Sequence, residues 1–362
     1  MIQGNNKISR DRTGYTLVEI LVVMLISFIV LGGVYKAITT ENIELDKEEI
    51  ILDMQLNARA ALDIIAADIR KTGFLGCAGN LAADTTGNSG PADPIQAHTT
   101  AGIVNTDLPI LNALRGAAGV DYLGDPLAYV NNAPASHATY QQNTDVLSVR
   151  YLSGDEPLQV DMASATSDPK VLATNTFSQG DILYITDCEF YSVFQKTDSG
   201  STQDIGHVTG SLVPGNSSTN LGQVYRLNSR VYNLVVNTYF IQTGSFAISR
   251  NRTGDDIAEN IEDLQFQYKW DVNNNNILSD DPWSDTYPLA VAAEMGAIRI
   301  FVLARSAPVY SYTNTNTYDY PNSPYCSAAG AALFTCSGTA LPNDNFYRYL
   351  ASAEVKLRNS GL

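Results

Sequence analysis

Residues 15–38 form an almost unbroken apolar run, and no other feature of the chain constrains its fold as strongly. The run is interrupted only by Thr16, Glu19, Ser27 and Lys36. As an α-helix it rises roughly 36 Å, which is enough to cross the hydrocarbon core of a bilayer. The polar and mildly basic residues 1–14 precede it, so the positive-inside tendency places the N-terminus in the cytoplasm and residues 39–362 outside.

The apolar run does not fit a secretory signal peptide. Such a peptide has a shorter apolar region followed by a small-residue cleavage site, which is not found after residue 30, so we expect the helix to be retained. Glu19 lies one turn inside the run, where an ionised carboxylate costs on the order of 2.5 to 3.5 kcal/mol at mid-depth. It therefore needs a partner, unless the segment is a plain signal anchor whose Glu19 reaches toward the membrane surface.

The segment T-G-Y-T-L-V-E, Thr13 to Glu19, resembles the type III signal of type IV prepilins and type II secretion pseudopilins. The resemblance implies that a prepilin peptidase cuts after Gly14, which makes residues 1–14 a leader peptide, and that the same enzyme N-methylates Tyr15. It also implies that Glu19 pairs with the new α-amino group of a neighbouring subunit and sets the register of the helix in a filament. Tyr15 stands where phenylalanine is commoner, which preserves the aromatic bulk.

A second, amphipathic helical segment follows the apolar run. Residues 41–71 lack Gly and Pro and carry apolar residues at three- and four-residue steps, and Thr72-Gly73 is a helix stop signal. Residues 39–73 thus predict the second half of one helix of about 58 residues, whose first half enters a filament core and whose second half packs on a sheet. The alternative is a coiled coil, but the apolar seam outside the membrane lasts only about three heptads.

Residues 74–362 read as an extracytoplasmic β-rich domain. Two stretches, 78–144 and 307–345, are too long and too rich in small and polar residues for ordinary connections, so we expect them to be surface excursions. The fold class predicted is α+β and pilin-like, with a long N-terminal helix packed on an antiparallel sheet that carries large loop insertions. The expected strands are Val146–Leu152, Asp181–Phe190, Val231–Gln242, Phe246–Arg250, Leu264–Trp270, Ala297–Ala304 and Tyr347–Leu357.

The cysteines and the net charge narrow the choice of function. Cys77, Cys188, Cys326 and Cys336 show no metal-binding spacing, so an exported chain predicts two disulfides with three connectivities. The short loop between Cys326 and Cys336 favours that pair, which leaves Cys77 with Cys188. The formal net charge of −16 disfavours nucleic-acid binding.

Several later segments resemble, in order, the PilW class of minor pilins, which are similar to the J-type pseudopilins of type II secretion. They are R-K-T-G-F-L-G-C at Arg70 to Cys77, T-D-C-E at Thr186 to Glu189, I-E-D-L-Q-F-Q-Y at Ile261 to Tyr268, I-R-I-F-V-L-A-R-S at Ile298 to Ser306 and V-K-L-R-N at Val355 to Asn359. The resemblance supports the Cys77–Cys188 pair.

The PilW resemblance implies a minor pilin of the bacterial inner membrane and then of the pilus on the cell surface. Its partners would be prepilin peptidase, other minor and major pilins and a PilY-type adhesin, in a complex that primes pilus assembly for adhesion, motility or DNA uptake. The alternatives are a type II secretion pseudopilin and, from another class, a tip adhesin whose ligand-binding surface includes the tyrosines of residues 310–325.

A calcium loop is a further hypothesis, and otherwise no cofactor is expected. Asn/Asp residues alternate after a strand, and either Asp280 or Asp281 would have to supply the last ligand because Pro282 stands where an acid is expected. The alternative is a turn that needs no ion. The proposed ligands are Asp271, Asn273, Asn275, Ile277, Asp280 and Asp281.

The sequence does not predict an enzyme. It contains no G-x-S-x-G, H-E-x-x-H, G-x-x-x-x-G-K or G-x-G-x-x-G motif. His98, His137 and His207 lie in polar, loop-like contexts, so we expect each of them to be a solvated surface residue.

Overall fold

A computed structural model of the chain describes residues 15–72, 127–130, 141, 144–188, 191–210, 212, 216, 218–250, 255–271, 275, 277–284, 295–309 and 345–357. The chain divides into two compact units, residues 1–53 and 54–362, and each is described by itself. The predicted site residues outside the described ranges are Gly14, Cys77, Cys326, Cys336 and Asn273.

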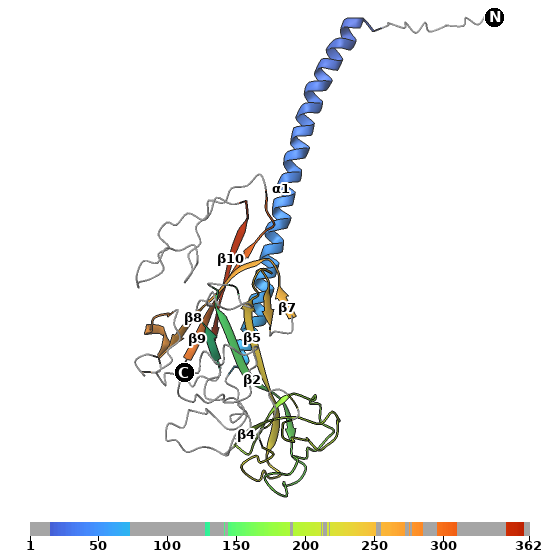
Figure 1. The fold of residues 1–362 in the computed structure, drawn as a ribbon. Coiled ribbons are helices and arrows are strands. Elements are labelled where there is room, and N and C mark those ends of the chain that lie inside the picture. Colours follow the sequence, from blue (N-terminus) through green and yellow to red (C-terminus); the bar gives the residue numbers. More distant parts are fainter. Residues whose placement is uncertain are drawn as a thin grey trace, which may run out of the picture. The chain divides into compact units, whose positions relative to one another are not determined.

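The helix α1 (Leu17–Lys71) is continuous through the apolar and the amphipathic segment, and it is drawn in blue in Figure 1. Its last turn closes when Thr72 N donates to Ile69 O at 3.1 Å and Thr72 Oγ1 donates to Asp68 O at 3.1 Å. The helix therefore ends where the Thr72-Gly73 signal predicts.

The last part of α1, which belongs to the second unit, buries one face. The buried positions recur at steps of three and four residues, as one face of an α-helix requires. They are Met54, Ala58, Ala61, Leu62, Ile65, Ala66, Asp68 and Ile69.

The larger sheet is antiparallel and has seven strands among the described residues. Its centre is the long pairing of β2 (Val146–Pro157) with β5 (Arg230–Ile241). The other strands are β1 (Leu127–Val130), β3 (Ile182–Thr186), β4 (Tyr191–Gln195), β6 (Ile248–Arg250) and β7 (Asp255–Ala258). The order β1-β2-β5-β3-β4 is completed by β6, which pairs with β5, and by β7, which pairs with β6.

The smaller sheet is antiparallel and has the order β10-β9-β8, formed by β8 (Ile261–Trp270), β9 (Met295–Arg305) and β10 (Arg348–Lys356). Asp145, just before β2, joins it to the larger sheet. Its N–H donates to Leu264 O at 2.8 Å, and its carboxylate accepts from Phe266 N at 2.9 Å. A short 3-10 helix, η1 (Leu278–Asp280), lies between β8 and β9.

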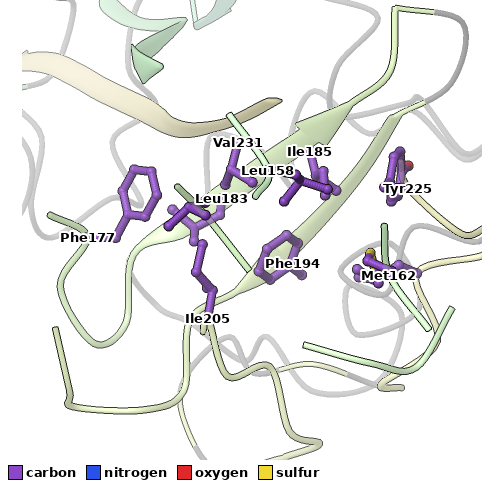
Figure 2. Close-up of a cluster of buried hydrophobic side chains, with 11 residues drawn as sticks. Leu158, Met162, Phe177, Leu183, Ile185, Phe194, Ile205, Tyr225 and Val231 are labelled. Atoms are coloured by element: carbon purple, nitrogen blue, oxygen red, sulfur yellow. The ribbon is translucent and has the colours of Figure 1, made fainter. Parts of the chain in front are cut away.

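Residues 158–229 are inserted at the end of the β2–β5 pair, since Pro157 and Arg230 on either side of the insertion are register partners. We call this insertion, which contains β3 and β4, the distal lobe. It has a hydrophobic core of its own (Figure 2), made with Val231 of β5: Leu158, Met162, Val171, Phe177, Leu183, Ile185, Phe194, Ile205, Leu221, Tyr225 and Val231.

The strands differ from the expected ones in several places, and both β4 (Tyr191–Gln195) and β7 (Asp255–Ala258) lie outside every expected strand. Residues 181–190 do not form one strand, because the chain turns after Thr186 and Cys188 adopts a φ of 75° between β3 and β4. A four-residue strand, β1, lies within the stretch 78–144 that we expected to be a surface excursion, and it pairs with β2. The stretch 307–345 lies outside the described residues except at its two ends.

Candidate functional site

The first turn of α1 contains a reciprocal hydrogen-bonded pair. Glu19 N donates to Thr16 Oγ1 at 3.3 Å, and Thr16 N donates to Glu19 Oε2 at 3.2 Å. The Thr16 hydroxyl also lies 3.3 Å from the same carboxylate oxygen. This is a capping box, in which two side chains satisfy backbone N–H groups that have no partner inside the helix.

The same carboxylate favours the helix electrostatically, because the start of a helix carries a partial positive charge. Glu19 thus has a local partner in the isolated subunit, which the apolar context of the sequence alone does not reveal. Tyr15 directly precedes the box and its side chain is exposed.

The helix that follows this box is suited to an apolar environment. Among the described residues, α1 is a helix long and apolar enough to cross a membrane. Its most apolar stretch is not buried by the rest of the protein. The exposed side chains between Leu17 and Ile38 include Phe28, Ile29 and Leu31. A helix that exposes so much apolar surface needs lipid or protein around it.

A second polar group lies at the other end of α1, and the sequence reading did not identify it. The buried carboxylate of Asp68 accepts hydrogen bonds from Tyr239 Oη at 2.6 Å, Asn237 Nδ2 at 2.6 Å and Tyr151 Oη at 3.1 Å. It also accepts one from Lys71 Nζ at 3.0 Å. We call these five residues the Asp68 cluster.

The Asp68 cluster joins α1 to the larger sheet. Burial alone raises the pKa of Asp68, but the hydrogen bonds from Tyr239, Lys71 and Asn237 outweigh burial, and the net effect lowers that pKa. In return the pKa of Tyr151 is raised, first by burial and then by the nearby negative charge of Asp68. The sequence does contain a signal for this cluster, because Asp68 is an acidic residue between Ile65 and Ile69 on the apolar face of the helix.

The predicted disulfides are only partly within the described residues. Cys188 takes part in a disulfide, and its backbone N–H donates to Thr186 Oγ1 at 3.0 Å. The other three cysteines lie outside the described ranges. The connectivity Cys77–Cys188 and Cys326–Cys336 therefore stays a prediction.

Two of the candidate calcium ligands, Asp271 and Asn275, accept hydrogen bonds from backbone N–H groups of the same loop. Asn275 N donates to Asp271 Oδ1 at 3.1 Å, and Ile277 N donates to Asn275 Oδ1 at 2.7 Å. Asp271 and Asp281 are buried. In the part of the chain that the structure describes, no group of three or more His, Cys, Asp or Glu residues is arranged to hold a metal ion.

Among the histidines, His207 differs from its expected environment. Only 1% of it is exposed, so the prediction of a solvated surface residue is wrong for it. The imidazole ring packs edge-on against the Phe194 ring, with 5.4 Å between the two ring centroids. Its Nε2 atom lies 2.9 Å from Thr219 O. His207 Nδ1 lies 2.9 Å from Asp168 Oδ1, but the two atoms do not meet the geometry of a hydrogen bond. The contact is an ion pair only when the imidazole ring is protonated. His98 and His137 lie outside the described residues.

Two known protein families match this chain, one near each end. Residues 9–35 match the prokaryotic N-terminal methylation motif, and residues 228–359 match the family Type IV Pilus-assembly protein W. The first match contains Gly14, Thr16 and Glu19, and the second contains β5 to β10. Most of the distal lobe lies outside both matches.

No curated protein matches the chain. Among solved structures, the type IV-like pilin TTHA1219 from Thermus thermophilus is 14% identical, and the match covers 36% of this chain and 70% of that one with a TM-score of 0.20. That score is too low to support an argument, so the α+β fold rests on the helix and antiparallel sheets described above. The methylation motif at one end and the pilus-assembly match at the other support the resemblance to type IV pilus minor pilins of the PilW class.

Proposed function

We propose that the protein is a minor pilin that prepilin peptidase cleaves after Gly14 and N-methylates on Tyr15, and that it helps to prime or assemble a type IV pilus. The observation that carries the proposal is the carboxylate of Glu19, placed in the first turn of an exposed apolar helix and 3.2 Å from Thr16 N. The methylation-motif match over residues 9–35 supports the processing step.

Cleavage after Gly14 would change the charges at this end of the helix. It would create a positive α-amino group on Tyr15, next to Thr16, whose N–H already donates to Glu19. In an apolar surrounding, a carboxylate and an ammonium group each need a partner of opposite charge. The Glu19 of one subunit and the Tyr15 amino group of its neighbour would satisfy each other.

The proposed partners follow from this pairing. Other minor and major pilins would supply the neighbouring N-termini, and the inner membrane would hold the helix before assembly. A PilY-type adhesin as an additional partner rests on the family resemblance alone.

The test replaces Glu19 by alanine and counts surface pili by electron microscopy, with N-terminal sequencing of the protein from the same cells. We expect a Tyr15 N-terminus in both proteins and fewer pili for Glu19→Ala. Glu41→Ala is the matched control, because Glu41 is an exposed acid on the same helix beyond the apolar run. Normal piliation by Glu19→Ala would contradict the pairing, and an uncleaved N-terminus in the wild type would contradict the processing.

A further inference from the structure

The Asp68 cluster takes no part in the proposed processing or in the pairing of Glu19. We propose that this cluster fixes the axial position of α1 on strands β2 and β5. Asp68 is then a positioning residue, which determines which residues of the last part of the helix pack on the sheet.

The apolar contacts of α1 do not determine this position by themselves. Nearly every buried apolar residue in this part of the helix has another buried apolar residue three or four positions further along. Ala58, for example, is followed by Ala61 and Leu62, and Ala61 is followed by Ile65. A shift of one turn, about 5.4 Å along the axis, would therefore replace apolar side chains by other apolar side chains.

The polar contacts forbid the same shift. Moving α1 by one turn would bring Ile64 or Ile65, or else Lys71 or Thr72, to the place of Asp68. An isoleucine there would leave the hydroxyl groups of two tyrosines and the amide of Asn237 without an acceptor. A buried donor that loses its partner destabilises the fold, so the arrangement with an isoleucine at this place is strongly disfavoured.

The geometry of the donors makes the position specific. Asn237 and Tyr239 alternate along β5, so both point to the same face of the sheet. Their register partners on β2 are Val149 and Leu147, and Tyr151 follows two residues after Val149 on that face. Donors from two paired strands thus converge on one carboxylate of α1.

A single buried polar contact that selects one packing arrangement among several apolar ones is a known use of buried polar groups. The inference does not depend on pilus assembly. It concerns the packing within residues 54–362, and it can be tested on the isolated protein whether or not the proposed function holds.

The experiment measures one distance in the full chain in detergent micelles. Spin labels are placed on cysteines introduced at Ala67 and Gln242, both exposed, and the distance is measured by pulsed electron paramagnetic resonance. The protein without these cysteines controls for labelling of the native ones. In the protein that keeps Asp68, we expect one narrow distribution of the distance between the two spin labels. In Asp68→Leu, we expect a second population whose distance differs from the first by up to about 5 Å, the rise of one helical turn.

Two further variants keep the test decisive. Asp63→Leu alters an exposed acid of the same helix and should keep the single distance. If Asp68→Leu does not fold, the double variant Tyr151→Phe with Tyr239→Phe removes two donors and keeps both rings, and it should show the second population. A folded Asp68→Leu protein, or in its place a folded double variant, with the single distance of the unaltered protein would overturn the proposal.

Discussion

Tyr239 Oη donates a 2.6 Å hydrogen bond to Asp68 Oδ2, so a strand residue and a helix residue far apart in the sequence share one buried contact. The pKa of Asp68 is lowered in the folded protein from its ordinary value of 3.8. A carboxyl with a lowered pKa stabilises the fold fully above its ordinary pKa, and this contribution is lost as the pH falls through the folded-state pKa.

We therefore expect acid to destabilise the wild-type protein more than Asp68→Asn. The free energy of unfolding should be higher for the wild type at pH 7, and the difference should shrink from about pH 5 downward. Denaturant titrations at several pH values measure it. Asp63→Asn, an exposed control on the same helix, should follow the wild-type curve. A wild-type to Asp68→Asn difference that is constant down to pH 2 would contradict the role of the Asp68 charge.

The capping box at the start of α1 gives a second prediction. Thr16→Val keeps the side-chain shape but removes the oxygen that accepts from Glu19 N. Loss of an N-cap costs about 0.5–2 kcal/mol, so the first turn should exchange its amide hydrogens faster in micelles. Thr40→Val, whose hydroxyl bonds to Lys36 O inside the helix, should leave that exchange unchanged. Equal exchange for Thr16→Val and wild type would show that the box does not stabilise the turn.

Lys196 gives a third prediction, for the distal lobe. Its ammonium group is buried and donates to Asp198 O, Asp198 Oδ2 and Gly200 O at 2.8–2.9 Å. Lys196→Met should lower the free energy of unfolding by about 1.5–3 kcal/mol, the range for hydrogen bonds to charged groups. Lys170→Met, at a half-buried lysine of the same lobe, serves as control and should cost less. Equal stability of Lys196→Met and wild type in denaturant titrations would count against this account.

The fourth prediction concerns the cysteines. Mass spectrometry of a non-reduced digest should recover Cys77 joined to Cys188 and Cys326 joined to Cys336. Replacing Cys188 by serine should lower stability by about 2–4 kcal/mol, which is typical for loss of a disulfide. A peptide joining Cys188 to Cys326 or Cys336 would show that the predicted connectivity is wrong.

The fifth prediction concerns the loop after β8. Asp271 Oδ1 and Asn275 Oδ1 both accept backbone N–H groups of this loop, which supports a turn that needs no ion. Removing calcium with a chelator should leave the thermal midpoint unchanged. A midpoint that rises with added Ca²⁺, but not with Mg²⁺, and no longer does so in Asp271→Asn would instead establish a calcium site.

Local patterns predicted much of the fold. The position of α1 and most strands follow from hydrophobic periodicity and from stop signals such as Thr72-Gly73. The expected strand Asp181–Phe190 runs past the turn at Cys188, whose positive φ separates β3 from β4, and β4 lies beyond the end of that expected strand. The short β1 was missed because its strand character depends on pairing with β2.

The local composition around His207 predicted an exposed side chain, and this prediction is wrong. A polar neighbourhood along the chain suggested solvent exposure, yet the distal lobe folds around the ring and places Phe194 against it. Burial of this kind depends on contacts between segments that are distant in sequence, and no local pattern records them.

The sequence alone indicates the resemblance to type IV pilins, because Gly14, the apolar run and Glu19 occupy one contiguous segment whose chemistry can be read directly. Only the tertiary structure revealed how α1 is held on the sheet. Asp68, Tyr151, Asn237 and Tyr239 come from a helix and two strands, and their hydrogen bonds exist only after these elements have packed together.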